Sequence, residues 1–132
     1  MVDISSLLHT AKTIAVVGLS AKPDRASYQV ANYLQQHGFR IIPVNPTETV
    51  ILGEPCFARL TDIPFHIDIV NIFRASKDVP PIIDDAIAMN AGAVWLQLEI
   101  THPAAEERAR TAGLVVVSNR CIKIDHLQYG TR

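Results

Sequence analysis

The sequence predicts an α/β protein in which helices cover both faces of a parallel sheet. The first observation is a set of short, mainly apolar runs rich in β-branched residues, which are typical of buried parallel strands. These runs lie at residues 14–17, 39–44, 67–73, 93–98 and 114–117. The second observation is that amphipathic helical patterns and short connections separate these runs, as in right-handed βαβ units. We therefore expect a Rossmann-like three-layer α/β/α sandwich with a five-stranded parallel sheet.

Two helices are predicted near the start of the chain. A short one covers residues 3–10, with Asp3 as its N-cap. A longer one covers residues 27–37, with Ser27 as its N-cap and an apolar stripe that faces the sheet. Gly38 follows at the position where a left-handed residue commonly ends a helix.

Two more helices are predicted in the second half. One covers residues 80–90 and ends at Gly92, and the other runs from Pro103 to Gly113. The candidate N-caps are Ser76 or Asp78 for the first and Thr101 or His102 for the second. Residues 45–64 are expected to be mostly irregular, with one helical turn near residues 59–63. From residue 119 onward the pattern is weakly amphipathic and defines no element.

Length and composition predict a single domain, residues 1–132, with its own core. Hydrophobic residues make up 48% of the chain and charged residues 19%, as in globular proteins. A net charge of −1 gives no bulk attraction for nucleic acid or for an anionic membrane. No apolar run approaches the roughly 18 residues that would span a membrane. Residues 1–12 lack a secretory signal pattern, so we expect a cytoplasmic protein.

The cysteines, histidines and serines predict neither a metal site nor a catalytic residue. Cys56 and Cys121 lie far apart in the sequence, which favours two reduced thiols. The histidines share no ligand spacing. No His–Asp partner is indicated for Ser20 or Ser27.

The first strand leads into a loop that suits an anion. Gly18 ends the apolar run and permits a sharp turn or the close approach of a ligand. Lys22 and Arg25 follow, and then a helix begins. Exposed N–H groups and the helix dipole at such a helix start can hold phosphate. The ends of the other strands should meet at the same rim of the sheet, at residues 45–46, 73–77 and 97–101.

The rim residues favour a ligand richer in phosphate than NAD. A dinucleotide-binding loop has three spaced glycines and an acidic residue after the second strand. Here Gly18 stands alone, and the second strand ends Val44-Asn45-Pro46 without a carboxylate. The basic residues at the rim are Lys22, Arg25, Arg74 and Lys77. Coenzyme A, which carries a pyrophosphate and a 3′-phosphate, could use several of these cations.

Five segments, in order along the chain, resemble the small stand-alone CoA-binding proteins. They are residues 18–30 (GLSAKPDRASYQV), 42–46 (IPVNP), 68–74 (DIVNIFR), 94–97 (VWLQ) and 119–126 (NRCIKIDH). The same domain forms the nucleotide-binding part of succinyl-CoA synthetase α subunits. The resemblance extends from about residue 14 to residue 126, and it implies that the chain binds coenzyme A or an acyl-CoA.

The resemblance also implies where the cofactor contacts the chain. The implied cofactor-binding residues are Gly18, Leu19, Ser20, Lys22, Pro23, Arg25, Ser27, Asn45, Pro46, Phe73, Arg74, Lys77 and Gln97. The loop residues would line the pyrophosphate, Phe73 and Arg74 the adenosine end, and residues 97–99 the pantetheine arm. Relatives commonly place glycine where this chain has Glu99. A carboxylate there could narrow the channel or repel acidic acyl groups.

Three functional hypotheses follow. The leading one is a CoA-binding module without catalysis, with a small-molecule ligand as its partner. The second is a small NADP-dependent oxidoreductase whose basic loop holds the 2′-phosphate. The third is an interaction protein that kept the fold and lost the ligand. The sequence is also compatible with a homodimer and with a mixed disulfide between CoA and Cys56 or Cys121.

Overall fold

The computed structural model describes residues 2–130 and joins five strands into one sheet, in the order β2-β1-β5-β6-β7. The strands are β1 (Thr13–Val17), β2 (Arg40–Val44), β5 (Ile69–Ile72), β6 (Ala93–Leu96) and β7 (Val115–Val117). Each coincides with one predicted apolar run, apart from small differences at the ends. All four pairings are parallel. The predicted five-stranded parallel sheet is therefore confirmed.

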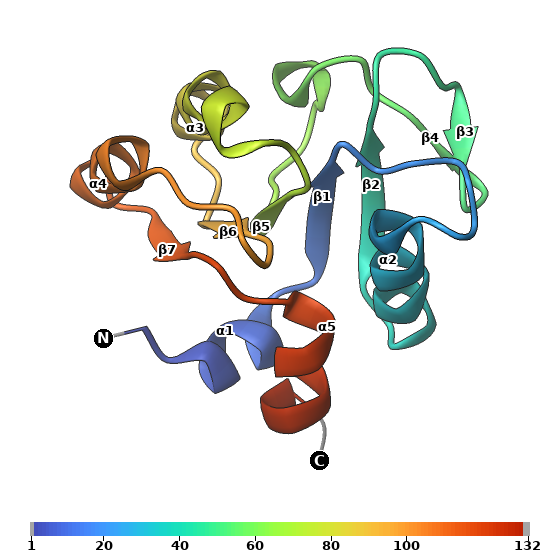
Figure 1. The fold of residues 1–132 in the computed structure, drawn as a ribbon, viewed down its shortest axis with the longest axis horizontal. Helices are drawn as coiled ribbons and strands as arrows, with labels where there is room; N and C mark the ends of the chain where they lie inside the picture. Colours follow the sequence, from blue (N-terminus) through green and yellow to red (C-terminus); the bar gives the residue numbers. More distant parts are fainter. Residues whose placement is uncertain (1, 131–132) are drawn as a thin grey trace.

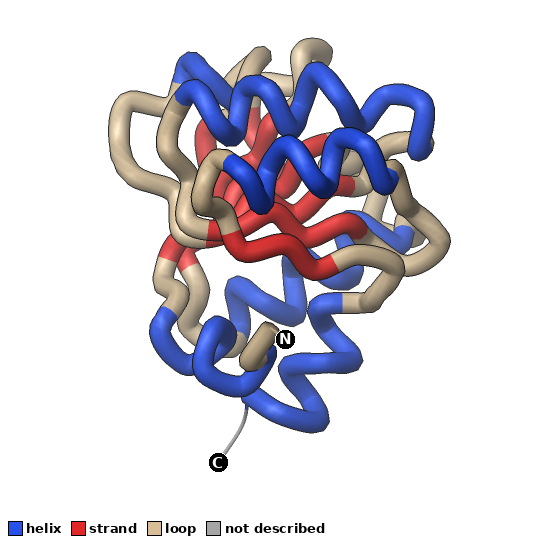
Figure 2. Tube along the Cα trace, turned by 90° about the vertical axis from the view of Figure 1, so that its left-hand side faces the viewer, coloured by secondary structure: helices blue, strands red, loops and turns tan. Residues whose placement is uncertain are grey.

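Helices cover both faces of this sheet, as Figure 2 shows. On one face lie α3 (Val79–Ala88) and α4 (Pro103–Thr111), and on the other lie α1 (Ile4–Thr10), α2 (Ala26–Gln36) and α5 (Ile122–Asp125) (Figure 1). Alternate β1 side chains serve the two layers: Ala15 joins the core under α3 and α4, whereas Ile14 joins the core under α1, α2 and α5. Burial on both faces explains why the strands are mainly apolar and do not alternate between apolar and polar residues.

The strand order reverses at β1. The chain passes from β1 to β2 on one side and later returns to place β5 on the other side. Val17 is level with both Val44 and Ile72, so the three carboxyl ends form one rim. In open α/β sheets the ligand crevice lies at such a reversal, beyond the carboxyl ends of the strands. We therefore expect the ligand site at the segments that follow Val17, Val44 and Ile72.

The start of α2 differs from the prediction. The helix begins at Ala26, and Arg25, which has an extended backbone, occupies the N-cap position without a side-chain capping bond. The prediction that Ser27 caps this helix is wrong, because Ser27 already lies inside the first turn. The predicted end is confirmed, since Gly38 follows the last turn with a φ of 94°.

The ends of α3 also differ from the prediction. Asp78 occupies the N-cap position, as predicted, but its side chain accepts no capping hydrogen bond among the described residues, and a 3₁₀ turn (Ser76–Asp78) leads directly into the helix. The helix was predicted to end at Gly92, but α3 ends at Ala88, and Asn90 takes the left-handed position after it, with a φ of 59°. Gly92 meets a different need, since a Cβ atom there would lie 2.8 Å from the Asp68 carbonyl oxygen.

The other predicted caps are present. Asp3 accepts a hydrogen bond of 3.0 Å from the Ser6 N–H at the start of α1. Of the two candidates for α4, His102 is the cap, because its Nδ1 accepts from the Ala105 N–H at 3.2 Å. A carboxylate of Glu106 accepts from the His102 N–H in return, at 2.8 Å. This reciprocal pair of bonds resembles a capping box.

Two segments that the sequence left undefined have short elements. Within residues 45–64 lies a hairpin of β3 (Val50–Ile51) and β4 (Glu54–Pro55), followed by a 3₁₀ turn (Leu60–Asp62). The turn was predicted, but strands of this length carry too few residues for a periodic signal. The tail forms α5, continued by a π-helical turn (His126–Gly130). Arg120 holds this tail through two hydrogen bonds to Asp125, of 2.7 and 2.8 Å.

At the opposite rim, Asp68 fastens the start of β1, and this contact predicts a pH dependence. Its Oδ2 accepts the N–H groups of Lys12 at 2.7 Å and of Thr13 at 3.1 Å. Burial alone raises the pKa of Asp68, but these bonds and nearby His66 outweigh it and lower the pKa below the ordinary 3.8. A lowered folded pKa means that the stabilisation is complete above the unfolded pKa and disappears as the pH falls through the folded value.

Asp68→Asn should therefore lower the free energy of unfolding at pH 7 by about 1 kcal/mol. The difference from the wild type should shrink as the pH falls from about 5 to about 3. Urea unfolding at each pH measures it, with the exposed Asp24→Asn as the control. A difference that stays constant over this range would contradict the account.

Candidate functional site

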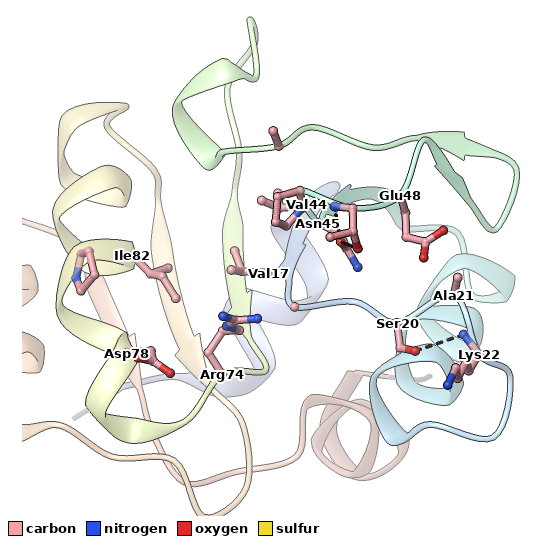
Figure 3. Close-up of a pocket in the computed structure, with 15 residues that line it drawn as sticks. Val17, Ser20, Ala21, Lys22, Val44, Asn45, Glu48, Arg74, Asp78 and Ile82 are labelled. Carbon is pink, nitrogen blue, oxygen red and sulfur yellow. Dashed lines mark hydrogen bonds between the residues drawn. The ribbon is translucent and has the colours of Figure 1, made fainter.

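The rim at the strand reversal contains a cleft of about 640 Å³, which we call the glycine-loop cleft (Figure 3). It is lined by Val17, Gly18, Ser20, Ala21, Lys22, Val44, Asn45, Pro46, Thr47, Glu48, Ala58, Arg74, Asp78, Pro81 and Ile82. Six of the predicted site residues come together here: Gly18, Ser20, Lys22, Asn45, Pro46 and Arg74. They come from the segments after β1, β2 and β5, as the topology requires.

Gly18 is needed because the chain after β5 crosses directly over it. Its φ is 86°, a left-handed conformation that favours glycine. A Cβ atom at Gly18 would overlap the Phe73 carbonyl oxygen and lie 2.8 Å from Cδ of Arg74. The missing side chain thus makes room for the Arg74 stem. In Figure 3 the Arg74 side chain lies between two groups of residues: Asp78, just before α3, and Ile82 of α3 on one side, and the loop residues Ser20 and Lys22 on the other.

The loop between β1 and α2 is closed by its own serines. The Ser27 Oγ accepts a hydrogen bond of 3.0 Å from the Ser20 N–H. The Ser20 Oγ in turn accepts one of 3.0 Å from the Lys22 N–H. Ser27 therefore ties the helix to the loop rather than capping the helix. The first N–H groups of α2 have no side-chain cap among residues 2–130, and they retain their capacity to bind an anion.

Asn45 joins the loops that follow β1 and β2. Its Nδ2 donates to the Leu19 carbonyl at 2.9 Å. Its Oδ1 accepts from both the N–H and the hydroxyl of Thr47, at 2.8 and 2.9 Å. The side chain of Leu19 is buried in the core, so this residue reaches the rim only through its backbone. Asn45 and Leu19 thus shape the cleft, while their polar groups are engaged within the protein.

The cations at this rim are unpaired, unlike most arginines elsewhere. Ion pairs are formed by Arg59, Arg108, Arg110 and Arg120. Within residues 2–130, no ion pair involves Lys22, Arg25, Arg74 or Lys77. Lys22 and Arg74 line the cleft, whereas Arg25 and Lys77 are exposed on the elements that flank it. An unpaired guanidinium and ammonium beside an uncapped helix start are suited to phosphate groups.

Sequence reasoning missed the carboxylates of this cleft. Glu48 lines it from the loop after β2, and Asp78 lines it from the start of α3. The absence of an acid directly after β2 had argued against a nucleotide with a free ribose diol. Glu48 supplies such an acid a few residues later. The sequence offered one signal for Glu48, its position shortly after the end of β2, but no spacing rule distinguishes it from other loop residues.

A second cleft, of about 520 Å³, lies beside the first, and we call it the apolar cleft. It is lined by Ala26, Val30, Phe73, Arg74, Ala75, Gln97, Leu98, Glu99, Ile100, Cys121 and Ile124. Two of the predicted site residues, Phe73 and Gln97, lie here. Arg74 lines both clefts, which makes the two spaces neighbours across one side chain.

Gln97 presents an amide donor to the apolar cleft. Its Oε1 accepts from the Ile122 N–H at 3.4 Å and from Asn71 Nδ2 at 3.2 Å. A backbone N–H can only donate, so the oxygen of Gln97 must face Ile122. The Nε2 group is left without a partner among residues 2–130 and belongs to a residue that lines the cleft. Asn71 also donates to the Trp95 carbonyl, which fixes its orientation.

Glu99 stands at the rim of the apolar cleft in a strained conformation. Its φ is 70°, and that of Asn119 opposite is 57°. The Glu99 N–H donates to the Asn119 Oδ1 at 2.6 Å, so the two left-handed turns hold each other. Asparagine tolerates this conformation, but glutamate does not favour it. The position would suit glycine, and the sequence places an exposed carboxylate there.

The remaining predicted residue lies apart from both clefts. Pro23 lines a depression on the outer side of α2, together with Tyr28 and Tyr33. Within residues 2–130, no group of three or more acidic, histidine or cysteine side chains is arranged to hold a metal ion. The same part of the chain contains no helix with the length and apolarity needed to cross a membrane.

Comparison with known proteins gives a consistent result. The chain matches the family described as "CoA binding domain" over residues 12–127. It is 38% identical over 124 residues to the uncharacterized protein YneT of Bacillus subtilis (strain 168), covering 94% of this chain and 92% of that protein. It is 34% identical over 83 residues to the ADP-forming acetate–CoA ligase II of Archaeoglobus fulgidus, covering 61% of this chain but 12% of the ligase.

A solved structure confirms the fold. The structure of a hypothetical protein from Pyrococcus horikoshii OT3 has a TM-score of 0.93 and 37% sequence identity to this chain. The likeness covers 96% of this chain and 89% of that one.

Gly18→Ala should destabilise the protein by about 3 kcal/mol, from left-handed strain and from overlap with the Phe73 carbonyl. Gly38→Ala is the matched control, because Gly38 also has a positive φ but no atom lies within 4 Å of its Cβ position. It should lose only about 1 kcal/mol. Urea unfolding measures both variants. Equal losses would show that nothing crosses Gly18 closely.

Glu99→Gly should stabilise the protein by about 0.5–1 kcal/mol, because it removes the left-handed strain. Glu99→Ala removes the same carboxylate but keeps Cβ, so it should give no such gain. Thermal unfolding of the two variants compares them directly. A gain with alanine as large as that with glycine would assign the effect to charge instead of backbone strain.

Proposed function

The chain belongs to the CoA binding domain family, and from this premise we propose that it binds coenzyme A or an acyl-CoA through the glycine-loop cleft. One observation carries the proposal: unpaired Lys22 and Arg74 line a cleft beside an α2 N-terminus that has no side-chain cap. An anionic ligand would supply the missing partners for all three. The partial identity to an acetate–CoA ligase agrees with a CoA ligand.

In the proposed complex the pyrophosphate lies at the loop of residues 18–20 and faces the first turn of α2. Lys22 and Arg74 donate to its oxygens, and Arg25, at the N-cap position, contributes from the outside. A guanidinium suits phosphate through its planar set of donors. Glu48 and Asp78 can accept hydrogen bonds from the ribose 2′-hydroxyl or from the adenine amino group.

The pantetheine arm is proposed to pass Arg74 and enter the apolar cleft. Arg74 is the residue shared by the two clefts, so a ligand held there by its phosphates can reach both spaces. The free Nε2 of Gln97 can then donate to an amide carbonyl of the arm. Phe73 would contact the arm instead of the adenosine end, because it lines the apolar cleft.

We propose binding without catalysis. No histidine lines either cleft among the described residues, so neither holds an imidazole base beside the thiol of Cys121. We also place the protein in the cytoplasm, because both cysteines are free. A homodimer stays a prediction. The NADP-dependent oxidoreductase is the second candidate. Lys22 and Arg74 favour it, because cations in the cleft suit its 2′-phosphate, whereas Glu48 near the end of β2 is the kind of residue that selects NAD.

Arg74→Ala and Lys22→Ala should each weaken CoA binding by roughly tenfold to a hundredfold, through loss of one charge-assisted contact. Arg110→Ala is the control, because Arg110 lies on α4 and lines neither cleft. Titration calorimetry with CoA, NADP and ADP measures the effect and ranks the ligands. Unchanged affinity in both cleft variants, or tight binding of NADP alone, would contradict the proposal.

A further inference from the structure

We propose that the apolar cleft receives an uncharged aliphatic acyl group carried on the CoA thiol, and that Glu99 rejects acyl groups ending in a carboxylate. This inference rests on the proposed function and adds the class of acyl-CoA to it. Four features of the apolar cleft carry it: exposed aliphatic walls, continuity with the glycine-loop cleft, one amide donor and one rim carboxylate.

The walls of the cleft expose large aliphatic side chains. Leu98 is 54% exposed and Ile124 is 56% exposed, and both line the cleft. Val30, which is buried, and half-buried Ile100 line the same cleft. An acyl chain between Leu98 and Ile124 would remove apolar surface on both sides from water. Each methylene buried in this way should tighten binding by roughly fourfold.

The cleft lies where the thiol end of the ligand would arrive. Arg74 lines both clefts, so a chain extending from phosphates at Arg74 enters the apolar cleft next. Gln97 supplies an amide donor inside this cleft, and its Oε1 is already engaged by Asn71 and Ile122. A thioester has one carbonyl oxygen followed by an apolar chain. The carbonyl oxygen matches the amide donor of Gln97, and the apolar chain matches the aliphatic walls of the cleft.

Glu99 gives the cleft a charge preference. Its backbone is held in the left-handed region by the bond of 2.6 Å to Asn119, so the carboxylate stays at the rim despite the strain. The other charged residue of the lining is Arg74, which the phosphates engage in the proposed complex. A terminal acyl carboxylate would therefore meet a like charge and aliphatic side chains. Both disfavour it.

The first test measures affinity against chain length. Calorimetry with CoA, acetyl-CoA, butyryl-CoA and hexanoyl-CoA should show hexanoyl-CoA binding at least tenfold more tightly than acetyl-CoA. In Leu98→Asn and Ile124→Asn this ratio should fall to about half or less. Val50→Asn is the matched control, because Val50 is 58% exposed on β3 and lines neither cleft. It should keep the wild-type ratio.

The second test measures charge selectivity with an isosteric pair. Wild type should bind butyryl-CoA at least tenfold more tightly than succinyl-CoA, which has a carboxylate in place of the terminal methyl group. Glu99→Gln keeps the side-chain length and the backbone strain, and it should reduce this preference by about threefold. Glu107→Gln, on α4, removes an exposed carboxylate elsewhere and should leave the preference unchanged.

The outcomes separate the two proposals. CoA binding with equal affinity for acetyl-CoA and hexanoyl-CoA would overturn the acyl subsite and leave the CoA proposal standing. A preference for succinyl-CoA, or a preference unaltered by Glu99→Gln, would overturn the role of Glu99. Absence of binding by every CoA species would overturn both proposals.

Discussion

The close crossing at Gly18 is the constraint on which the candidate site depends. The chain after β5 passes so near to the end of β1 that a Cβ atom at Gly18 would overlap the Phe73 carbonyl. This crossing carries Arg74 over the first loop and gives its side chain a place in both clefts. Gly18 was expected to permit a sharp turn or the close approach of a ligand. Its φ of 86° provides the turn, and on its Cβ side the protein's own chain approaches closely. The crossing also places the Arg74 guanidinium where a ligand can bind it.

The polar groups of the rim divide into those used by the fold and those left for a partner. The fold uses the side chains of Asn45, Ser20 and Ser27, which form hydrogen bonds within and between the loops. Arg74 and Lys22 have no ion pair among residues 2–130. Rigid loops that expose unpaired cations are preorganised for an anion, since little ordering remains to be done on binding.

The sequence predicted the sheet and most helices because short, mainly apolar runs without polar alternation leave few alternatives to buried parallel strands. Helix termini were harder, since Ser27 and Gly92 are common terminal residue types that here serve loop closure and close packing. Six site residues were predicted to converge because strand ends share one rim. Glu48 and Asp78 were not predicted as site residues, because their positions depend on the paths of loops, and loops have no periodic sequence pattern. The apolar cleft was predicted only in part. The resemblance implied residues 97–99 for the pantetheine arm, but no sequence signal showed that α2 and α5 complete the cleft.

A crystal structure of the protein with bound coenzyme A tests the central claim most directly. The account predicts the pyrophosphate at the loop of residues 18–20, within hydrogen-bonding distance of the Arg74 guanidinium and of the first N–H groups of α2. It also predicts the thiol in the apolar cleft near Gln97. A pyrophosphate held at another edge of the sheet, with Arg74 still unpaired, would contradict the account.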